Sequence, residues 1–368
     1  MKNLMKRILH CCFLILFCVC NARAEDRVDL SQVQGNHNDF DPALYAKHFK
    51  KSITYDEWKA LPRGVKEKAG EGSDAYVVSF TSWPPRTREG TPGIWITIET
   101  LMCQTHKADR IILWLSRKEY PNELKDLPQT LIDLQSRGLE IVFVENNYKP
   151  AKKLVHALQA NLKSNIITAD DDVLYPKDWL SRFVRGHQEH PNTILALVTH
   201  RMKVVDGVLQ PYSHFSPHTT GQRLCDNLDM AIGFGGVLYP YDESGSTCNG
   251  LDKRVLDVAL IEEHATKSDD PWFFACRVLA GTQLASVASP TKAIKDDITF
   301  LALDEPLWQE NVQNKRNDKV IRALLQAFPE LGPKLGLDLS KTQCVAQNAK
   351  LSFWQRVKAW FGKGSAVT

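Results

Sequence analysis

The chain of 368 residues is predicted to form an α/β domain in which a mostly parallel sheet is flanked by helices. Three observations predict this class. Short apolar runs alternate with segments of helical spacing from residue 75 to residue 198. The runs are apolar throughout, as in strands that are buried on both faces. Polar and charged residues follow several of the runs, at the strand ends where parallel sheets bind ligands.

The first four strands are expected at 75–80, 110–115, 139–144 and 165–169, each a short apolar run. Helices with an apolar face are expected at 94–103, 127–137 and 151–162, and Gly138 ends the second of them. Pro176 suits the first turn of a further helix. The shared apolar face of that helix consists of Leu180, Phe183, Val184 and His187. A fifth strand follows at 193–198.

After residue 200 the alternation weakens, and we expect the second half of the same domain there. Residues 204–209 predict a hairpin with Asp206 and Gly207 at its turn. The stretch 211–229 is polar and irregular, whereas 231–239 is apolar and contains three glycines. The remaining expected elements are helices at about 252–264 and 270–280 and a strand at about 282–287.

The first 24 residues have the layout of a secretory signal peptide. Three basic residues precede an apolar run from Ile8 to Cys20, and small residues follow, with cleavage expected after Ala24. The run is shorter than the roughly 20 residues that a spanning helix needs. An uncleaved N-terminal anchor is the alternative. We therefore expect an exported or membrane-anchored protein, either in a periplasm or lumen or on the cytoplasmic face of a membrane.

Removal of this segment with its four basic residues changes the formal charge from +3 to −1. A nearly neutral protein lacks the basic surface that binds nucleic acid, so no nucleic-acid partner is expected. Of the nine cysteines, five lie beyond the apolar run, and their spacing fits no zinc motif. In an exported chain Cys225 and Cys248 are the candidates for a disulfide, and five buried reduced thiols are the alternative.

The chain is expected to have four parts. Residues 1–24 are the signal peptide or anchor, 25–73 a polar stem with one or two short helices, 74–340 the α/β domain and 341–368 an amphipathic C-terminal tail. One helical face of the tail would carry Phe353, Trp354, Val357, Trp360 and Phe361. Two interpretations fit this face: peripheral contact with a membrane interface, and docking on the domain.

Asp170, Asp171 and Asp172 directly follow the fourth expected strand. Like charges this close repel one another and raise their pKa values unless a cation lies among them. Alternate residues of an extended chain point to the same side, so Asp170 and Asp172 could hold Mg²⁺ or Mn²⁺. Such an ion would neutralise a diphosphate leaving group. A solvated acidic turn or a helix N-cap is the alternative.

Asp269 and Asp270 begin an expected helix. A carboxylate at that position is either a helix cap or a general base that takes the proton of an acceptor hydroxyl. The glycines at 233, 235 and 236 allow close approach of the backbone to a ligand, or tight packing within a strand.

Basic residues lie on two of the strand-end loops and could meet a diphosphate, although isolated surface charges are the alternative. These residues are Arg86, Arg88, Lys152 and Lys153. Among the tryptophans of the domain, Trp272 is the one assigned to the site, because aromatic faces stack on sugar rings or nucleobases.

Together these segments resemble the family 2-like glycosyltransferases with the GT-A fold, in a bacterial subgroup, from about residue 76 to about residue 328. Residues 167–176 are similar to the DXD segment of that family and are the most specific match. Residues 78–86 look like the first strand and nucleotide loop. The segments at 236–240 and 269–273 look like the later acceptor loop and the catalytic-base segment. Pro271 and the stretch 241–249 depart from the family pattern, so acceptor specificity is not carried over.

The resemblance implies a metal-dependent transferase that moves a sugar from a nucleoside-diphosphate sugar to a glycan or glycoconjugate acceptor, with inversion. It implies that Asp170 and Asp172 bind Mn²⁺ or Mg²⁺, and that Asp270 is the catalytic base with Asp269 as its substitute. The residues implied at the nucleotide sugar are Thr81, Arg86, Lys153, Asp170, Asp171, Gly235, Gly236 and Trp272.

Two other functions stay open. A catalytically silent sugar-binding or scaffold protein on the same fold would bind donor without needing Asp270. A metal-dependent phosphoesterase would need further ligands, and the nearest histidines, His187 and His200, fall on a helix face and at a strand end. The export signal conflicts with a periplasm that is not expected to hold nucleotide sugars. A lumenal enzyme, a cytoplasmic domain behind an N-terminal anchor, or a lipid-linked donor would each resolve that conflict.

Overall fold

The structure is a computed structural model that describes residues 33–89, 91, 93–266, 268–289, 292, 294–301 and 315–341. The signal peptide or anchor expected at 1–24 lies outside the described residues, as does all but the first residue of the tail expected at 341–368. A search of the described part finds no helix with the length and apolar character needed to cross a membrane.

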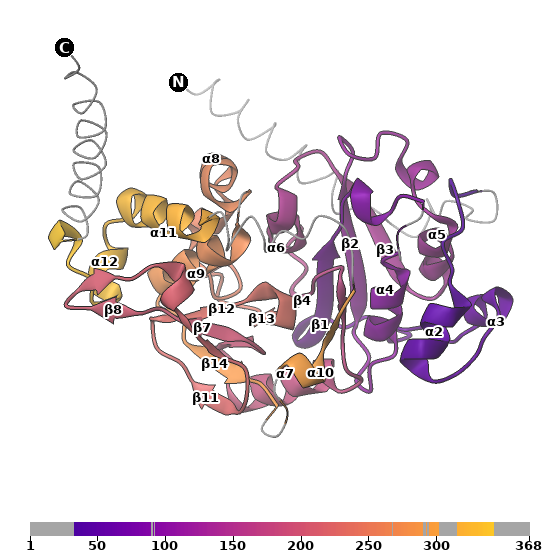
Figure 1. Ribbon diagram of the computed structural model, residues 1–368, viewed down its shortest axis with the longest axis horizontal. Helices are drawn as coiled ribbons and strands as arrows, with labels where there is room; N and C mark the ends of the chain where they lie inside the picture. Colours follow the sequence, from indigo (N-terminus) through magenta and orange to yellow (C-terminus); the bar gives the residue numbers. More distant parts are fainter. Residues whose placement is uncertain are drawn as a thin grey trace, which may run out of the picture.

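Eight strands form the main sheet of the molecule (Figure 1). In sheet order they are β11 (Gln222–Leu224), β14 (Leu284–Val287), β6 (Ile194–Ala196), β13 (Val237–Tyr239), β4 (Ser164–Thr168), β1 (Gly72–Thr81), β2 (Arg110–Ser116) and β3 (Leu139–Val144). The pairs β1–β2, β1–β4, β2–β3 and β6–β14 are parallel, whereas β13 is antiparallel to both of its neighbours and β11 to β14. The predicted α/β class with a mostly parallel sheet is confirmed.

The strands form where apolar runs can be buried on both faces. All five residues of β4 and residues 75–80 of β1 are buried, because helices cover the sheet. The covering helices are α4 (Trp95–Met102), α5 (Gln129–Ser136), α6 (Lys152–Gln159), α7 (Trp179–Glu189) and α9 (Asp269–Ala280). Helix α6 packs on β1, β2 and β4, and α7 packs on β6 and β14. The predicted apolar face of α7 is fully buried.

The second half of the domain departs most from the sequence prediction. A three-stranded sheet is made of β10 (Ser216–His218), β7 (Thr199–Arg201) and β12 (Asp229–Ala231), and β10 lies within the stretch expected to be irregular. Its residues are largely polar and partly exposed, so they carry no apolar periodicity. The expected hairpin is present as β8 (Val204–Val205) and β9 (Val208–Leu209). Asp206 and Gly207 have positive φ angles of 52° and 78°, as a tight hairpin turn requires.

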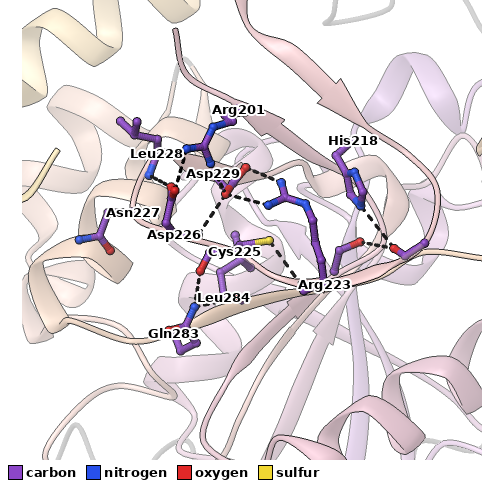
Figure 2. Close-up of polar contacts among 12 residues, drawn as sticks. Arg201, His218, Arg223, Cys225, Asp226, Asn227, Leu228, Asp229, Gln283 and Leu284 are labelled. Atoms are coloured by element: carbon purple, nitrogen blue, oxygen red, sulfur yellow. Dashed lines mark hydrogen bonds and ion pairs between the residues drawn. The ribbon is translucent and has the colours of Figure 1, made fainter. Parts of the chain in front are cut away.

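A buried carboxylate joins this small sheet to the edge of the main sheet (Figure 2). Asp229 of β12 is fully buried and lies 2.9 Å from Arg201 of β7 and 2.5 Å from Arg223 of β11. Arg201 also pairs with Asp226, at 2.7 Å. Two arginines therefore compensate the buried charge of Asp229, and the network fixes the chain between β11 and β12.

The remaining elements are short. The helix expected at 252–264 is broken into a 3₁₀ turn (Lys253–Leu256), α8 (Val258–Leu260) and a π-helix (Ile261–Ala265). Asp257 is the N-cap of α8, and its side chain accepts a hydrogen bond from the backbone amide of Leu260, so a new helix begins there. The others are β5 (Val173–Leu174), α10 (Ile294–Asp297), β15 (Thr299–Phe300), α11 (Arg316–Ala327) and α12 (Leu331–Lys334).

The described part of the expected stem packs on the domain beside α4 and α5 (Figure 1). It contains two short helices, α2 (Pro42–Phe49) and α3 (Tyr55–Lys59). Trp58 of α3 is fully buried, and its indole nitrogen donates to the buried carboxylate of Glu99 at 2.8 Å. Arg137 pairs with the same carboxylate at 2.6 Å. This segment is therefore part of the hydrophobic core.

The disulfide proposed between Cys225 and Cys248 is wrong, since both cysteines carry free thiols. They flank one stretch of sequence but are held by different partners. The backbone amide of Cys225 donates to Leu284 of β14, whereas Cys248 and Leu251 exchange backbone hydrogen bonds within a local turn. Cys103 and Cys276 are also free, so the four cysteines of the described part are all reduced.

Candidate functional site

A cavity of about 850 Å³ opens where β1 and β4 end and α9 begins. Its walls include Thr81, Arg86, Lys153, the three aspartates 170–172, Asp269 and Asp270. Segments far apart in the sequence thus meet at one edge of the sheet, as expected for strands that end at a shared ligand site.

Lys153 joins the two acidic groups of the cavity. It lies in the first turn of α6, and its ammonium nitrogen is 2.6 Å from Asp170 Oδ1 and 3.0 Å from Asp269 Oδ2. Burial alone would lower the pKa of Lys153, but Asp170, Asp269 and Asp270 hold that pKa well above its ordinary value. The lysine is therefore charged at neutral pH and neutralises part of the acidic cluster.

Arg86 faces the other two aspartates of the triplet. Its guanidinium is 3.0 Å from Asp172 and 3.5 Å from Asp171, and the hydroxyl of Ser82 donates to Asp171 at 2.5 Å. Burial raises the pKa of Asp171 to about 6, and Arg86 opposes that rise. Asp171 is thus turned toward the loop after β1, while Asp170 and Asp172 are the more exposed members of the triplet.

Asp270 is the other carboxylate in the first turn of α9. Its Oδ1 accepts a hydrogen bond from the backbone amide of Gly233 at 3.0 Å. Burial first, and then the neighbouring charge of Asp269, raise the pKa of Asp270 to about 8. A Cβ atom at Gly233 would lie 2.9 Å from Lys153 Nζ and 3.0 Å from Asp270 Oδ1, so a larger residue at this position would displace these side-chain ends.

The carboxylates of Asp170 and Asp172 fit a divalent cation in part. Within the described residues, no three His, Cys, Asp or Glu side chains converge into a ready-made cage. Mg²⁺ is commonly held by one or two carboxylates together with substrate phosphates, and two carboxylates are what this site offers. Burial and then the charge of Asp170 raise the pKa of Asp172, so the two groups lie close enough to repel each other. A cation between them would relieve that repulsion.

Three of the predicted site residues do not line the cavity. Trp272 is fully buried, with its ring against those of His264 and Phe328. Gly235 and Gly236 pack on Trp179 of α7: the carbonyl of Gly235 accepts from its indole nitrogen at 2.8 Å. The structure gives these two glycines packing contacts, whereas the adjacent residues of the same turn, Gly233 and Phe234, face the cavity.

Several cavity residues were missed by the sequence analysis. One is Glu119, in the loop after β2, which lies 2.7 Å from the nitrogen of Lys152, a fully buried residue that was expected to meet a diphosphate. The position of Glu119 just after an expected strand could have indicated it. His200 and Tyr212 also line the cavity, 3.1 Å apart, but they come from β7 and the polar stretch after it. No local pattern in the sequence indicated either residue.

Comparison with known proteins finds one family that part of the chain matches. The family described as "Glycosyl transferase family 2" matches residues 88–239, a range that contains Lys153 and the aspartate triplet. Among curated protein sequences, none matches the chain.

Similar solved structures include TarS residues 1–349 of S. aureus in complex with UDP, at 15% identity and a TM-score of 0.39, covering 60% of this chain and 59% of that one. HddC from Yersinia pseudotuberculosis is similar at 12% identity and a TM-score of 0.35, covering 66% of this chain and 99% of that one. The present chain thus spans less than two thirds of the TarS chain that it resembles. The match to the glycosyl transferase family 2 model therefore covers the segment of the chain that supplies Lys153 and the aspartate triplet.

Proposed function

We propose that the chain is a glycosyltransferase that moves a sugar from a nucleoside-diphosphate sugar to a hydroxyl group of a glycan or glycoconjugate, with inversion. The family match supports the reaction class. The observation that carries the proposal is the bridge from Asp170 through Lys153 to Asp269, because it brings the end of β4 and the start of α9 to one cavity. A donor bound at the first segment would then face a base on the second.

The donor side of the cavity is the end that contains Arg86, Lys152 and Lys153. These three buried cations would pair with the oxygens of a diphosphate, and each now pairs with a carboxylate. Asp170 and Asp172 would hold Mn²⁺ or Mg²⁺. When bound, the cation would stabilise the negative charge that develops on the leaving diphosphate.

Asp270 is proposed as the general base. Asp269 is committed to its ion pair with Lys153, whereas Asp270 accepts from a neutral backbone amide and has no ion pair within the described residues. In a single displacement, the acceptor oxygen forms its bond to the anomeric carbon as the bond to the diphosphate breaks. The proton of the acceptor hydroxyl passes to Asp270, and the nucleoside diphosphate leaves with the electron pair.

The test is a panel of nucleotide sugars with Mn²⁺ against the full chain, scored by thermal shift and by donor hydrolysis. A bound donor should raise the melting temperature by mass action. We expect Asp172→Asn to abolish the metal-dependent shift, and Asp270→Asn to keep the shift but lose hydrolysis. Asp74→Asn, an exposed residue of β1, is the matched control and should behave as wild type.

The outcomes separate the proposal from its main rival. Donor binding with hydrolysis that depends on Asp270 supports the transferase. Donor binding without turnover, unaffected by Asp270→Asn, would instead indicate a silent sugar-binding or scaffold protein. A chain that binds no nucleotide sugar, with or without metal, would refute the proposed donor class.

A further inference from the structure

We propose that Phe234 and Phe300 form the platform on which the acceptor is held, and that the acceptor presents a carbohydrate ring to it. This inference rests on the proposed function, and it adds the residues that hold a sugar ring of the acceptor. The two rings, here called the aromatic rim, both line the cavity. Their centroids are 5.3 Å apart and their planes meet at 58°.

Phe300 is the exposed member of the aromatic rim. Its side chain is 53% exposed, and it is the only aromatic residue among the exposed large hydrophobic residues of the described chain. Phe234 beside it is partly buried. Aromatic side chains that line a cavity together with a few polar groups are typical of ligand-binding sites.

Backbone contacts fix the aromatic rim to both chemical centres of the cavity. Phe300 lies on β15, which pairs with β5 directly after the aspartate triplet, and the next amide, of Leu301, donates to the carbonyl of Asp172 at 2.8 Å. Phe234 follows Gly233, whose amide holds Asp270. A group that rests on these rings would therefore lie between the donor side and the proposed base.

Tyr175 reinforces this arrangement by joining the aspartate triplet to Phe234. Its hydroxyl accepts from the backbone amide of Asp170 at 2.8 Å and donates to the carbonyl of Phe234 at 3.2 Å. The side chain is buried, so the hydroxyl has no alternative partner in water. The position of Phe234 is thus set by the same segment that supplies the predicted metal ligands.

The cavity lining that includes the rim also contains neutral hydrogen-bonding groups and the guanidinium of Arg316. His200 and Tyr212 are bonded to each other at 3.1 Å, and Asn317 lies in the same wall. Burial lowers the pKa of His200 to about 4, so its imidazole is neutral at pH 7. Apolar rings together with neutral donors and acceptors match a sugar ring, which has an apolar C–H face and hydroxyl groups at its edge.

The place of the rim favours the acceptor over the sugar of the donor. A donor held by Arg86, Lys152 and Lys153 would lie in the buried part of the cavity, because all three side chains are buried. Phe300 is instead half exposed, on the part of the cavity that an incoming acceptor reaches from solvent. We therefore expect substitution of Phe300 to weaken binding of glycans without weakening binding of the nucleotide sugar.

The experiment applies the full chain with Mn²⁺ to a printed array of neutral and anionic glycans, and measures donor thermal shifts on the same samples. The variants are Phe300→Ala, Phe300→Trp and, as the matched control, Leu224→Ala, an exposed apolar residue that does not line the cavity. Loss of one stacking ring should reduce glycan affinity by about tenfold in Phe300→Ala. Phe300→Trp should retain binding, and Leu224→Ala should match wild type.

Three results would overturn the inference: no glycan held by the wild type, equal glycan binding by Phe300→Ala, or a donor shift that falls in Phe300→Ala along with glycan binding. Each differs from failure of the proposed function, which would appear as the absence of any donor shift in the wild type. The array and the thermal shift therefore test the two proposals separately.

Discussion

Substitution of Lys153 by methionine should destabilise the fold strongly, and by an amount that depends on pH. The Lys153 side chain is only 7% exposed, and its ammonium nitrogen lies 2.6 Å from Asp170 and 3.0 Å from Asp269. Removal of one partner from a buried ion pair costs about 3–5 kcal/mol, because the remaining charges stay buried and uncompensated. Asp170 is 29% exposed, so water offsets part of the loss and we expect the lower value, about 3 kcal/mol.

For a domain of this size, about 3 kcal/mol corresponds to a fall in melting temperature of about 6–12 °C. The loss should be smaller at pH 5 than at pH 8. In the Lys153→Met variant, the carboxylates of the folded state would bind protons more readily than those of the unfolded state. The free energy of unfolding of the variant should therefore fall as the pH rises, and its difference from wild type should grow. Urea and thermal unfolding at both pH values measure the effect.

The matched control is Lys149→Met. Lys149 lies in the 3₁₀ turn that precedes α6, is 56% exposed and is 3.4 Å from Glu119. Its substitution should change the free energy of unfolding by less than about 0.5 kcal/mol. Two results would refute the reasoning that the lysine neutralises a buried acidic cluster. One is a free energy of unfolding of Lys153→Met within about 1 kcal/mol of wild type, and the other is an equal loss of that free energy in the two variants.

Three further predictions concern single residues. Because burial and Asp269 raise the pKa of Asp270 to about 8, the rate of donor hydrolysis should increase as the pH rises through about 8. A pH profile in which the rate instead increases near pH 4 would exclude Asp270 as the base. Trp58→Phe should lower the free energy of unfolding by about 1–3 kcal/mol in urea titrations, since it removes the hydrogen bond to buried Glu99. Gly236→Ala should cost more than about 2 kcal/mol in the same assay, because φ is 96° and the new Cβ would lie 2.7 Å from the ring of Trp179; a wild-type midpoint would contradict this close packing.

The sequence by itself determined the class of the fold and the place of the acidic triplet. Both depend on local information. A run such as β4 is apolar because each of its residues is buried, so its burial can be read from the run itself. The aspartates follow that run directly, and a strand end in a parallel sheet is where ligands bind. The apolar face of α7 was equally readable from its spacing.

Other features depended on contacts between distant segments. Strand β13 lies between β4 and β6 and runs antiparallel to both. An apolar run in the sequence predicts a buried strand but not the direction in which that strand runs. The expected role of Trp272 rested on residue type, but the structure buries its ring away from the cavity.

The site itself was decided mostly by the tertiary structure. Lys153 was expected at the nucleotide, and only the fold showed that its ammonium group bridges Asp170 and Asp269. His200 and Tyr212 come from a stretch without periodicity, and Phe300 from a two-residue strand, so nothing in their sequence neighbours marks them. The physical reason is that periodicity reports whether a side chain is buried, whereas charge neutralisation and cavity walls depend on which distant side chains become its neighbours.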